Sequence, residues 1–154
     1  MKKLNTTLLL IIKDDKILLA QKKRSFGEGK FNGVGGKAEV GETIEQTMLR
    51  ETKEEIGVVP KKYKLVGTID FDEYMKGERV LETMFIYVAS DYEGEPVESD
   101  EMRPAWFDLD KIPYDKMFPD DRLWLPEVLA GKTVSGTFVF DEDFNMLSHT
   151  IESK

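Results

Sequence analysis

Runs of β-branched and large apolar residues alternate with short polar segments along the chain, a pattern typical of a strand-rich protein. The runs at 6–12 and 17–20 flank Asp14 and Asp15, and this arrangement predicts a β-hairpin. Further strands are expected at 64–71, 80–89, 105–108, 133–140 and 146–151. Strands therefore dominate the expected fold.

Between the predicted hairpin and the next strand lie a glycine-rich segment and a segment with helical periodicity. Residues 24–36 are expected to form a loop whose backbone can approach a ligand closely, because glycine lacks a side chain. Residues 43–56 are expected to form a helix. Thr43 and Gln46 match a capping box, apolar side chains recur every four residues, and Gly57 ends the pattern.

A second helix is expected to begin at Asp120 or Asp121 and to end at Gly131. Because only two helices interrupt the strands, a doubly wound parallel sheet is disfavoured. We expect an α/β (α+β) fold, in which helices flank a mixed, partly antiparallel sheet. At this length, one domain spanning 1–154 is expected.

Composition narrows the class of protein. The chain carries 22 Lys and Arg against 30 Asp and Glu, a net charge of −8, which argues against a nucleic-acid polymer as partner. The absence of cysteine excludes thiolate chemistry and fits a reducing compartment, and a single histidine argues against a Ser-His-Asp triad. The apolar run at 8–12 is too short for a membrane span. A cytoplasmic protein without a membrane partner is expected.

Three glutamates gather on one side of the first predicted helix. At 100° per residue, Glu51, Glu54 and Glu55 share an arc of roughly 100° beside the apolar stripe. The stripe is formed by Ile44, Met48, Thr52 and Ile56. A solvated acidic face is one interpretation. The other is a divalent cation, Mg²⁺ or Mn²⁺, which would compensate the repulsion and which prefers oxygen ligands.

The pattern around these glutamates decides between the two interpretations. Residues 36–58 match Gly-x5-Glu-x7-Arg-Glu-x-x-Glu-Glu-x-Gly at Gly36, Glu42, Arg50, Glu51, Glu54, Glu55 and Gly57. At ~7% usage per residue type, such a match arises by chance about once in 10⁸ windows. The string resembles the Nudix box. The resemblance implies a pyrophosphohydrolase with an α/β/α sandwich fold, acting on a nucleoside diphosphate linked to another group.

The resemblance also implies roles for individual residues. The implied metal ligands are the Gly35 carbonyl and the side chains of Glu51, Glu54, Glu55 and Glu101. Glu101 is alternatively the general base, and Glu51 and Glu55 compete with it for that role. Glu42 and Arg50 would brace the helix. Mg²⁺ is the expected cofactor, with Mn²⁺ as a substitute.

One residue in the box departs from the usual pattern, because Thr52 stands where an aliphatic residue is common. A hydrogen bond from its hydroxyl to the carbonyl one turn earlier would limit the cost in packing.

The resemblance extends to 22–37, 96–109 and 112–124, which are similar to the branch of the family that hydrolyses oxidised purine nucleoside triphosphates. It implies a small-molecule substrate such as 8-oxo-dGTP or 2-oxo-dATP, a monophosphate and pyrophosphate as products, and a monomer. The implied substrate-binding residues are Thr7, Lys22, Phe26, Asn32, Gly35, Gly36, Lys37, Phe71, Phe118, Asp120, Asp121 and Trp124. The alternatives are another nucleoside diphosphate derivative or a non-catalytic nucleotide-sensing module.

Adjacent carboxylates at Asp120 and Asp121 are the most informative pair for the substrate. Beside an aromatic pocket, burial and mutual repulsion would raise the pKa of one of them, and a neutral carboxylic acid both donates and accepts hydrogen bonds. We therefore expect the pair to read the oxidised edge of the base, while one of the two caps the following helix. Two residues depart from the family pattern: Phe118 replaces the tryptophan of mammalian members, and Glu82 stands where an apolar pocket residue would align.

Overall fold

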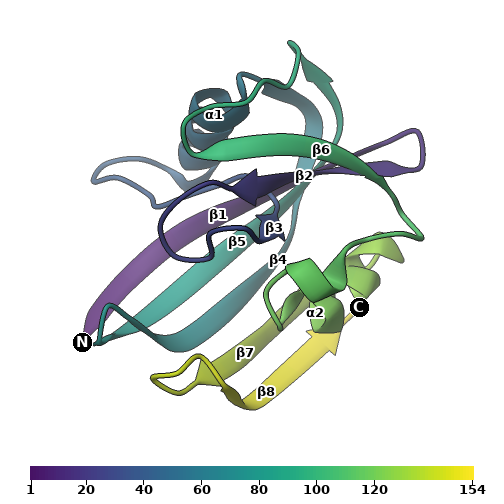
Figure 1. Ribbon diagram of the computed structural model, residues 1–154. Coiled ribbons are helices and arrows are strands. Elements are labelled where there is room, and N and C mark those ends of the chain that lie inside the picture. Colours follow the sequence, from purple (N-terminus) through teal and green to yellow (C-terminus); the bar gives the residue numbers. More distant parts are fainter.

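An eight-stranded mixed sheet forms the centre of the computed structural model, which describes all 154 residues (Figure 1). Its strands are β1 (Lys2–Lys13), β2 (Lys16–Lys22), β3 (Phe31–Asn32), β4 (Val59–Met75), β5 (Glu78–Glu93), β6 (Met102–Asp108), β7 (Val134–Phe140) and β8 (Met146–Ser153). The order is β3-β2-β1-β5-β4-β7-β8, and β6 also pairs with β2. The β1–β5 and β4–β7 pairs are parallel and the others antiparallel. The predicted mixed, partly antiparallel sheet is confirmed.

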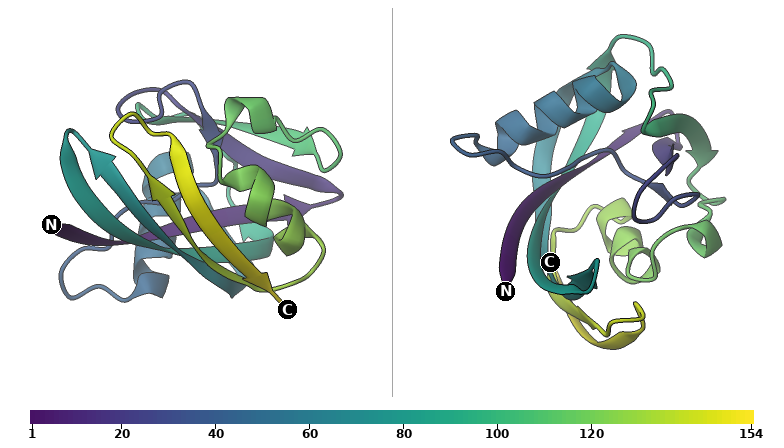
Figure 2. Two further views of the ribbon diagram at one scale, coloured as in Figure 1. Left: turned by 90° about the horizontal axis from the view of Figure 1, so that it is seen from below. Right: turned by 60° about the vertical axis from the view of Figure 1, so that its left-hand side comes forward.

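The two α-helices lie on opposite faces of this sheet (Figure 2). The helical elements are α1 (Ile44–Ile56), the short 3₁₀ helix η1 (Tyr114–Lys116) and α2 (Asp121–Leu129). Because successive side chains of a strand point to opposite faces, β1 contributes to both cores. Its Leu9 packs in one cluster with Met48 of α1, and its Leu8 packs in the other with Trp124 of α2. Neither α-helix is long and apolar enough to cross a membrane.

Local signals define α1 at both ends, as the sequence predicts. The Thr43 hydroxyl accepts a hydrogen bond from the Gln46 N–H at 3.1 Å, and the Gln46 side chain accepts one from the Thr43 N–H at 2.8 Å. Gly57 ends the helix in the left-handed conformation at φ 74°. The Thr52 hydroxyl donates to the Met48 carbonyl at 2.8 Å, so the expected hydrogen bond one turn back is confirmed. Contacts within the chain therefore define both ends of α1, the helix that carries the box glutamates.

The helix α2 begins at Asp121, as predicted, but its first turn is not capped as expected. The side chain of Asp120 makes no capping hydrogen bond to the helix. The Asp121 carboxylate instead accepts from the Phe118 N–H, three residues earlier, at 3.0 Å. The expectation that one of the two aspartates caps this helix is wrong, because both side chains turn toward the protein interior, where they are buried.

The long hairpin of β4 and β5 also exceeds its predicted extent. Pairing continues from Val59–Glu93 to Met75–Glu78, well beyond the expected ranges 64–71 and 80–89. The added pairs carry many charged and exposed residues, so the apolar pattern does not reveal them. This extension carries Glu73 and Met75 of β4 to the end of the sheet nearest α2 and the β7–β8 turn, where they line a pocket.

The capping box generates a prediction for stability. Thr43→Ala removes the acceptor for the Gln46 N–H and should lower the free energy of unfolding by about 1 kcal/mol, measured by urea denaturation. Thr43→Ser keeps the oxygen and should remain within about 0.5 kcal/mol of the parent chain. Equal losses in both variants would show that the hydroxyl does not stabilise α1.

Candidate active site

Two glycines allow the loop before α1 to lie directly against β1. A Cβ atom at Gly35 would stand 1.7 Å from the Thr7 carbonyl oxygen, and one at Gly36 would stand 2.5 Å from the Glu51 carboxyl carbon. Both distances exclude a side chain. The Thr7 N–H donates to the Gly36 carbonyl at 3.0 Å, which holds the loop in place. The loop backbone therefore contacts both the central strand and the acidic side of α1.

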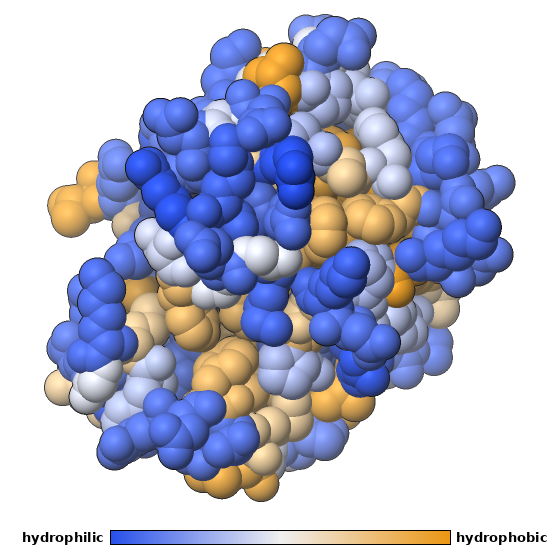
Figure 3. All heavy atoms as spheres, in the orientation of Figure 1, coloured by the Kyte–Doolittle hydropathy of each residue, from blue (hydrophilic) through white to orange (hydrophobic).

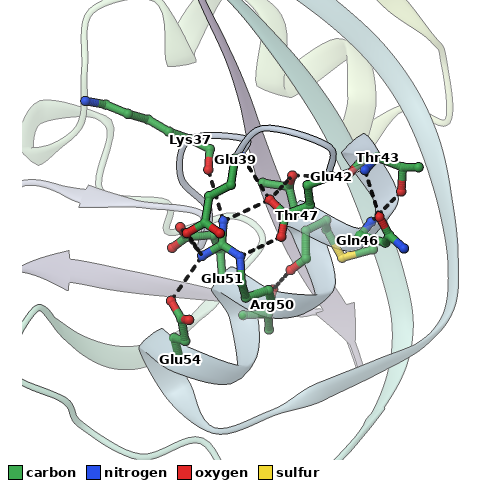
Figure 4. Close-up of polar contacts among 11 residues, drawn as sticks. Lys37, Glu39, Glu42, Thr43, Gln46, Thr47, Arg50, Glu51 and Glu54 are labelled. Carbon is green, nitrogen blue, oxygen red and sulfur yellow. Dashed lines mark hydrogen bonds and ion pairs between the residues drawn. The ribbon is translucent and has the colours of Figure 1, made fainter.

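Arg50 joins the loop to this helix (Figure 4). Its guanidinium binds Glu42 through two hydrogen bonds of 2.7 and 3.0 Å and donates to the Lys37 carbonyl at 3.1 Å. It also donates to Glu51 at 2.9 Å and to Glu54 at 3.2 Å. Hydrogen bonds from Arg50, supported by a backbone N–H and a threonine hydroxyl, lower the pKa of Glu42 to about 2. These contacts are those that the brace role of Glu42 and Arg50 requires.

Glu55 is the most buried carboxylate of the box. Its side chain is only 6% exposed, and its Oε1 accepts a hydrogen bond from the Gly35 N–H at 2.9 Å. Burial raises its pKa to about 8, and the charges of Glu51 and Glu101 add to the effect. Burial also raises the pKa of Glu51, while Glu54 is exposed. Negative charge is therefore in excess around Glu55.

A polar hollow opens beside Glu55, and we call it the carboxylate hollow. It is lined by Lys22, Arg24, Ser25, Glu55, Glu101 and Met102. The loop before β6 thus brings Glu101 to the same hollow as Glu55, although the two are distant in sequence. Arg24 donates to the Glu101 carboxylate at 3.3 Å. The arrangement joins residues from α1, β2 and the β5–β6 connection.

The donors here fit a hard divalent cation in chemistry. They are carboxylate and carbonyl oxygens, and their charges raise one another's pKa, which is the situation that a bound cation relieves. No three acidic side chains converge around an ion-sized space. Arg50 instead engages Glu51 and Glu54, and the Gly35 N–H engages Glu55. Binding a cation would therefore require these side chains to exchange partners.

A second cavity lies on the α2 face of the sheet, and we call it the aromatic pocket. It is lined by Lys22, Phe26, Asn32, Phe71, Glu73, Met75, Glu82, Met84, Phe118, Asp120, Asp121 and Phe144. The rings of Phe26 and Phe118 are 5.7 Å apart, and those of Phe26 and Phe144 are 5.3 Å apart. On this face of the molecule, hydrophobic residues are visible in a recess between hydrophilic ones (Figure 3). Lys22 lines this pocket and the carboxylate hollow, so the two cavities adjoin.

Asp120 and Asp121 form a buried acidic wall of the aromatic pocket. Their side chains are 4% and 2% exposed. The Trp124 indole N–H donates to Asp120 at 2.9 Å. Burial raises the pKa of Asp120 to about 6, and burial together with the charge of Asp120 raises that of Asp121 well above its usual range. The pair can therefore hold a proton near neutral pH.

Most of the predicted substrate-binding residues lie together. The aromatic pocket contains Lys22, Phe26, Asn32, Phe71, Phe118, Asp120 and Asp121. The loop bearing Gly35, Gly36 and Lys37 lies instead along β1, next to the acidic side of α1. The Asn32 side chain also accepts from the Gly33 N–H at 2.9 Å, so it shapes its turn as well as lining the pocket.

The structure does not bring two of the predicted substrate-binding residues, Thr7 and Trp124, to the lining of the aromatic pocket. Thr7 does not line the aromatic pocket, because alternation along β1 turns its neighbour Thr6 to that face, where the Thr6 hydroxyl donates to Glu82 at 2.6 Å. Trp124 lies in the core, where it is 1% exposed. It contributes to the pocket by donating a hydrogen bond to the wall residue Asp120.

Sequence reasoning missed four residues that line the aromatic pocket. They are Glu73, Met75, Met84 and Phe144. The alternation of β4 could have indicated the first two, since both share the parity of the predicted pocket residue Phe71. Nothing local in the sequence indicates Phe144, which reaches the pocket from the β7–β8 turn.

Comparison with known proteins identifies the family. The NUDIX domain model matches residues 1–128. The chain is 46% identical over 146 residues to the oxidized purine nucleoside triphosphate hydrolase of Danio rerio, covering 95% of this chain and 92% of that protein. The protein of the same name from Mus musculus is 41% identical over 145 residues, covering 94% and 92%.

Solved structures agree with this result. The mutator MutT protein from Bacillus halodurans superimposes with a TM-score of 0.85 at 30% identity, covering 97% of each chain. The strands β7 and β8, which follow the region matched by the domain model, extend the same sheet. With its box, its sheet and its relatives in agreement, the chain belongs to the Nudix family of hydrolases.

Proposed function

We propose that this Nudix hydrolase converts oxidised purine nucleoside triphosphates, such as 8-oxo-dGTP, to the monophosphate and pyrophosphate. The observation that carries the proposal is the junction at Lys22, where the carboxylate hollow meets an aromatic pocket walled by two buried aspartates. A nucleotide laid across this junction would place its base among aromatic rings and its phosphates beside the box. The names of the relatives from Danio rerio and Mus musculus support the same substrate.

The aromatic pocket offers what a purine base needs. Phe26, Phe118 and Phe71 supply ring surfaces for stacking, and Asn32 supplies an amide. The pair of Asp120 and Asp121 supplies acceptors together with a retained proton. A neutral carboxylic acid can donate to an oxygen of the base, while its charged neighbour accepts from an N–H of the base. The pair therefore suits a base edge that carries both a carbonyl oxygen and an N–H.

The phosphates require compensation of charge. A nucleoside triphosphate adds roughly four negative charges to a chain that already carries −8. Lys22 lines the junction and would contact the phosphate chain. Glu51, Glu54 and Glu55, with the Gly35 carbonyl and Glu101, would hold Mg²⁺, for which Mn²⁺ can substitute. Such an ion screens charge, polarises the attacked phosphorus and lowers the pKa of a bound water.

The residues of the carboxylate hollow would handle the proton of the attacking water. Glu55 and Glu101 both line the hollow, and either can accept that proton, whereas Arg50 orients the helix that carries the box glutamates. Exposed Glu54 lies on the solvent side of this helix. We propose a monomer as the working unit.

Removal of the buried box carboxylate tests the activity. Glu55→Gln should lower kcat/KM for pyrophosphate release from 8-oxo-dGTP with Mg²⁺ by about 100-fold or more, because both the cation and the proton acceptor are affected. Glu78→Gln removes an exposed carboxylate at the start of β5 and should leave the rate unchanged. No pyrophosphate release by the parent chain across a panel of nucleoside diphosphate derivatives would instead favour a nucleotide sensor.

The aspartate pair generates a prediction for base selectivity. In Asp121→Asn, the asparagine side chain does not titrate, so it cannot share a proton with Asp120. It should therefore change the ratio of kcat/KM for 8-oxo-dGTP and 2-oxo-dATP by at least about tenfold, the worth of one hydrogen bond. The Mg²⁺ concentration for half-maximal rate should stay within about twofold, because Asp121 is not part of the carboxylate hollow. A uniform loss on every nucleotide would contradict the proposed reading of the base.

A further inference from the structure

A second carboxyl pair lies on the sheet side of the aromatic pocket. Glu82 of β5 pairs across the strands with Phe71 of β4, and Glu73 follows two residues later on β4. Glu73 and Glu82 are therefore diagonal neighbours on one face, a spacing within reach of long side chains. Both line the pocket, together with Asp120.

One oxygen of this pair has no partner. Glu82 accepts a hydrogen bond from the Thr6 hydroxyl at 2.6 Å. Glu73 is only 4% exposed, and its Oε1 is buried without any hydrogen-bond partner. A buried acceptor without a donor is unfavourable, and such groups in folded proteins commonly have a ligand, ion or water as the missing partner.

The protonation of Glu73 defines what that partner must be. Burial, with the adjacent Glu82 carboxylate, raises the pKa of Glu73 to about 9, so Glu73 is neutral near pH 7 and gives its proton to Glu82. The remaining oxygen then behaves as a carbonyl acceptor. Lys22 is the only cation that lines the aromatic pocket, and Glu73 takes no hydrogen bond from it. An occupant of the pocket that carries an N–H group can supply the missing donor.

We propose that Glu73, oriented by Glu82, accepts a hydrogen bond from an N–H of the bound purine on an edge that Asp120 and Asp121 do not read. The inference rests on the proposed function and deepens it. An 8-oxopurine carries a hydrogen on N7, whereas N7 of an ordinary guanine or adenine is an acceptor. An acceptor facing N7 therefore attracts the oxidised base and repels the ordinary one. Glu73 thus determines specificity for oxidation at C8 of the purine.

Binding of monophosphates tests this contact without requiring hydrolysis. The affinities of 8-oxo-dGMP and dGMP would be measured by calorimetry at pH 7 for the parent chain, Glu73→Gln and Glu73→Met. The parent chain should prefer 8-oxo-dGMP by about tenfold or more. Glutamine donates an N–H to Glu82 and keeps a carbonyl acceptor, so it should keep that preference within about threefold. Methionine fills a similar volume without an acceptor and should lose at least about tenfold of the preference.

The outcomes separate this inference from the proposed function. A parent chain without a preference, a methionine variant that keeps it, or one that loses affinity for both nucleotides equally would overturn the role of Glu73. Thermal unfolding of each variant would show that the affinities refer to folded protein. If the parent chain selects 8-oxo-dGMP through Glu73 but releases no pyrophosphate, the proposed activity fails and the binding contact stands. If it hydrolyses 8-oxo-dGTP while the methionine variant keeps the preference, only the contact fails.

Discussion

Repulsion among the box glutamates is the constraint on which the rest of the site depends. Glu51, Glu54 and Glu55 crowd one side of α1, and burial makes the charge on Glu55 more costly. Arg50 offsets part of this repulsion and ties the helix to the preceding loop through Glu42. The remaining negative charge lies beside the loop backbone, where a divalent cation and a phosphate chain would neutralise one another. The clustered glutamates, which repel one another in the empty site, are therefore suited to a phosphate substrate that binds together with a divalent cation.

Strand alternation separates the chemistry from the recognition of the base. The central strand β1 supports α1 through Leu9 on one face and the aromatic pocket side through Thr6 on the other. Lys22, near the end of β2, lines both cavities. A rigid sheet can therefore fix the distance between base and phosphates. Substitutions on the pocket-facing side of β4 and β5 change the base pocket on the face of the sheet opposite α1. Glu73 and Glu82 are such residues, since neither contacts the box.

The parts of the structure that were predicted from sequence have strong local signals. The capping box at Thr43, the stop at Gly57 and the spacing of the glutamates all describe one helix, and the strand positions follow from apolar runs. The structure differs from the expectation where tertiary contacts decide. Strand alternation turns Thr6 rather than Thr7 toward the aromatic pocket, and Trp124 packs in the core instead of lining that pocket. Alternation along β4 indicates the side of the sheet to which Glu73 points, but not its burial, because an acidic residue near a polar strand end normally faces solvent.

A crystal structure with Mn²⁺ and a non-hydrolysable analogue of 8-oxo-dGTP tests the central claim most directly, because the anomalous signal of the ion identifies it without ambiguity. We expect a peak bounded by Glu51, Glu55 and the Gly35 carbonyl, with the phosphate chain on its other side and the base in the aromatic pocket. A bound nucleotide with no ion at these oxygens, and with Arg50 still holding Glu51 and Glu54, would contradict it.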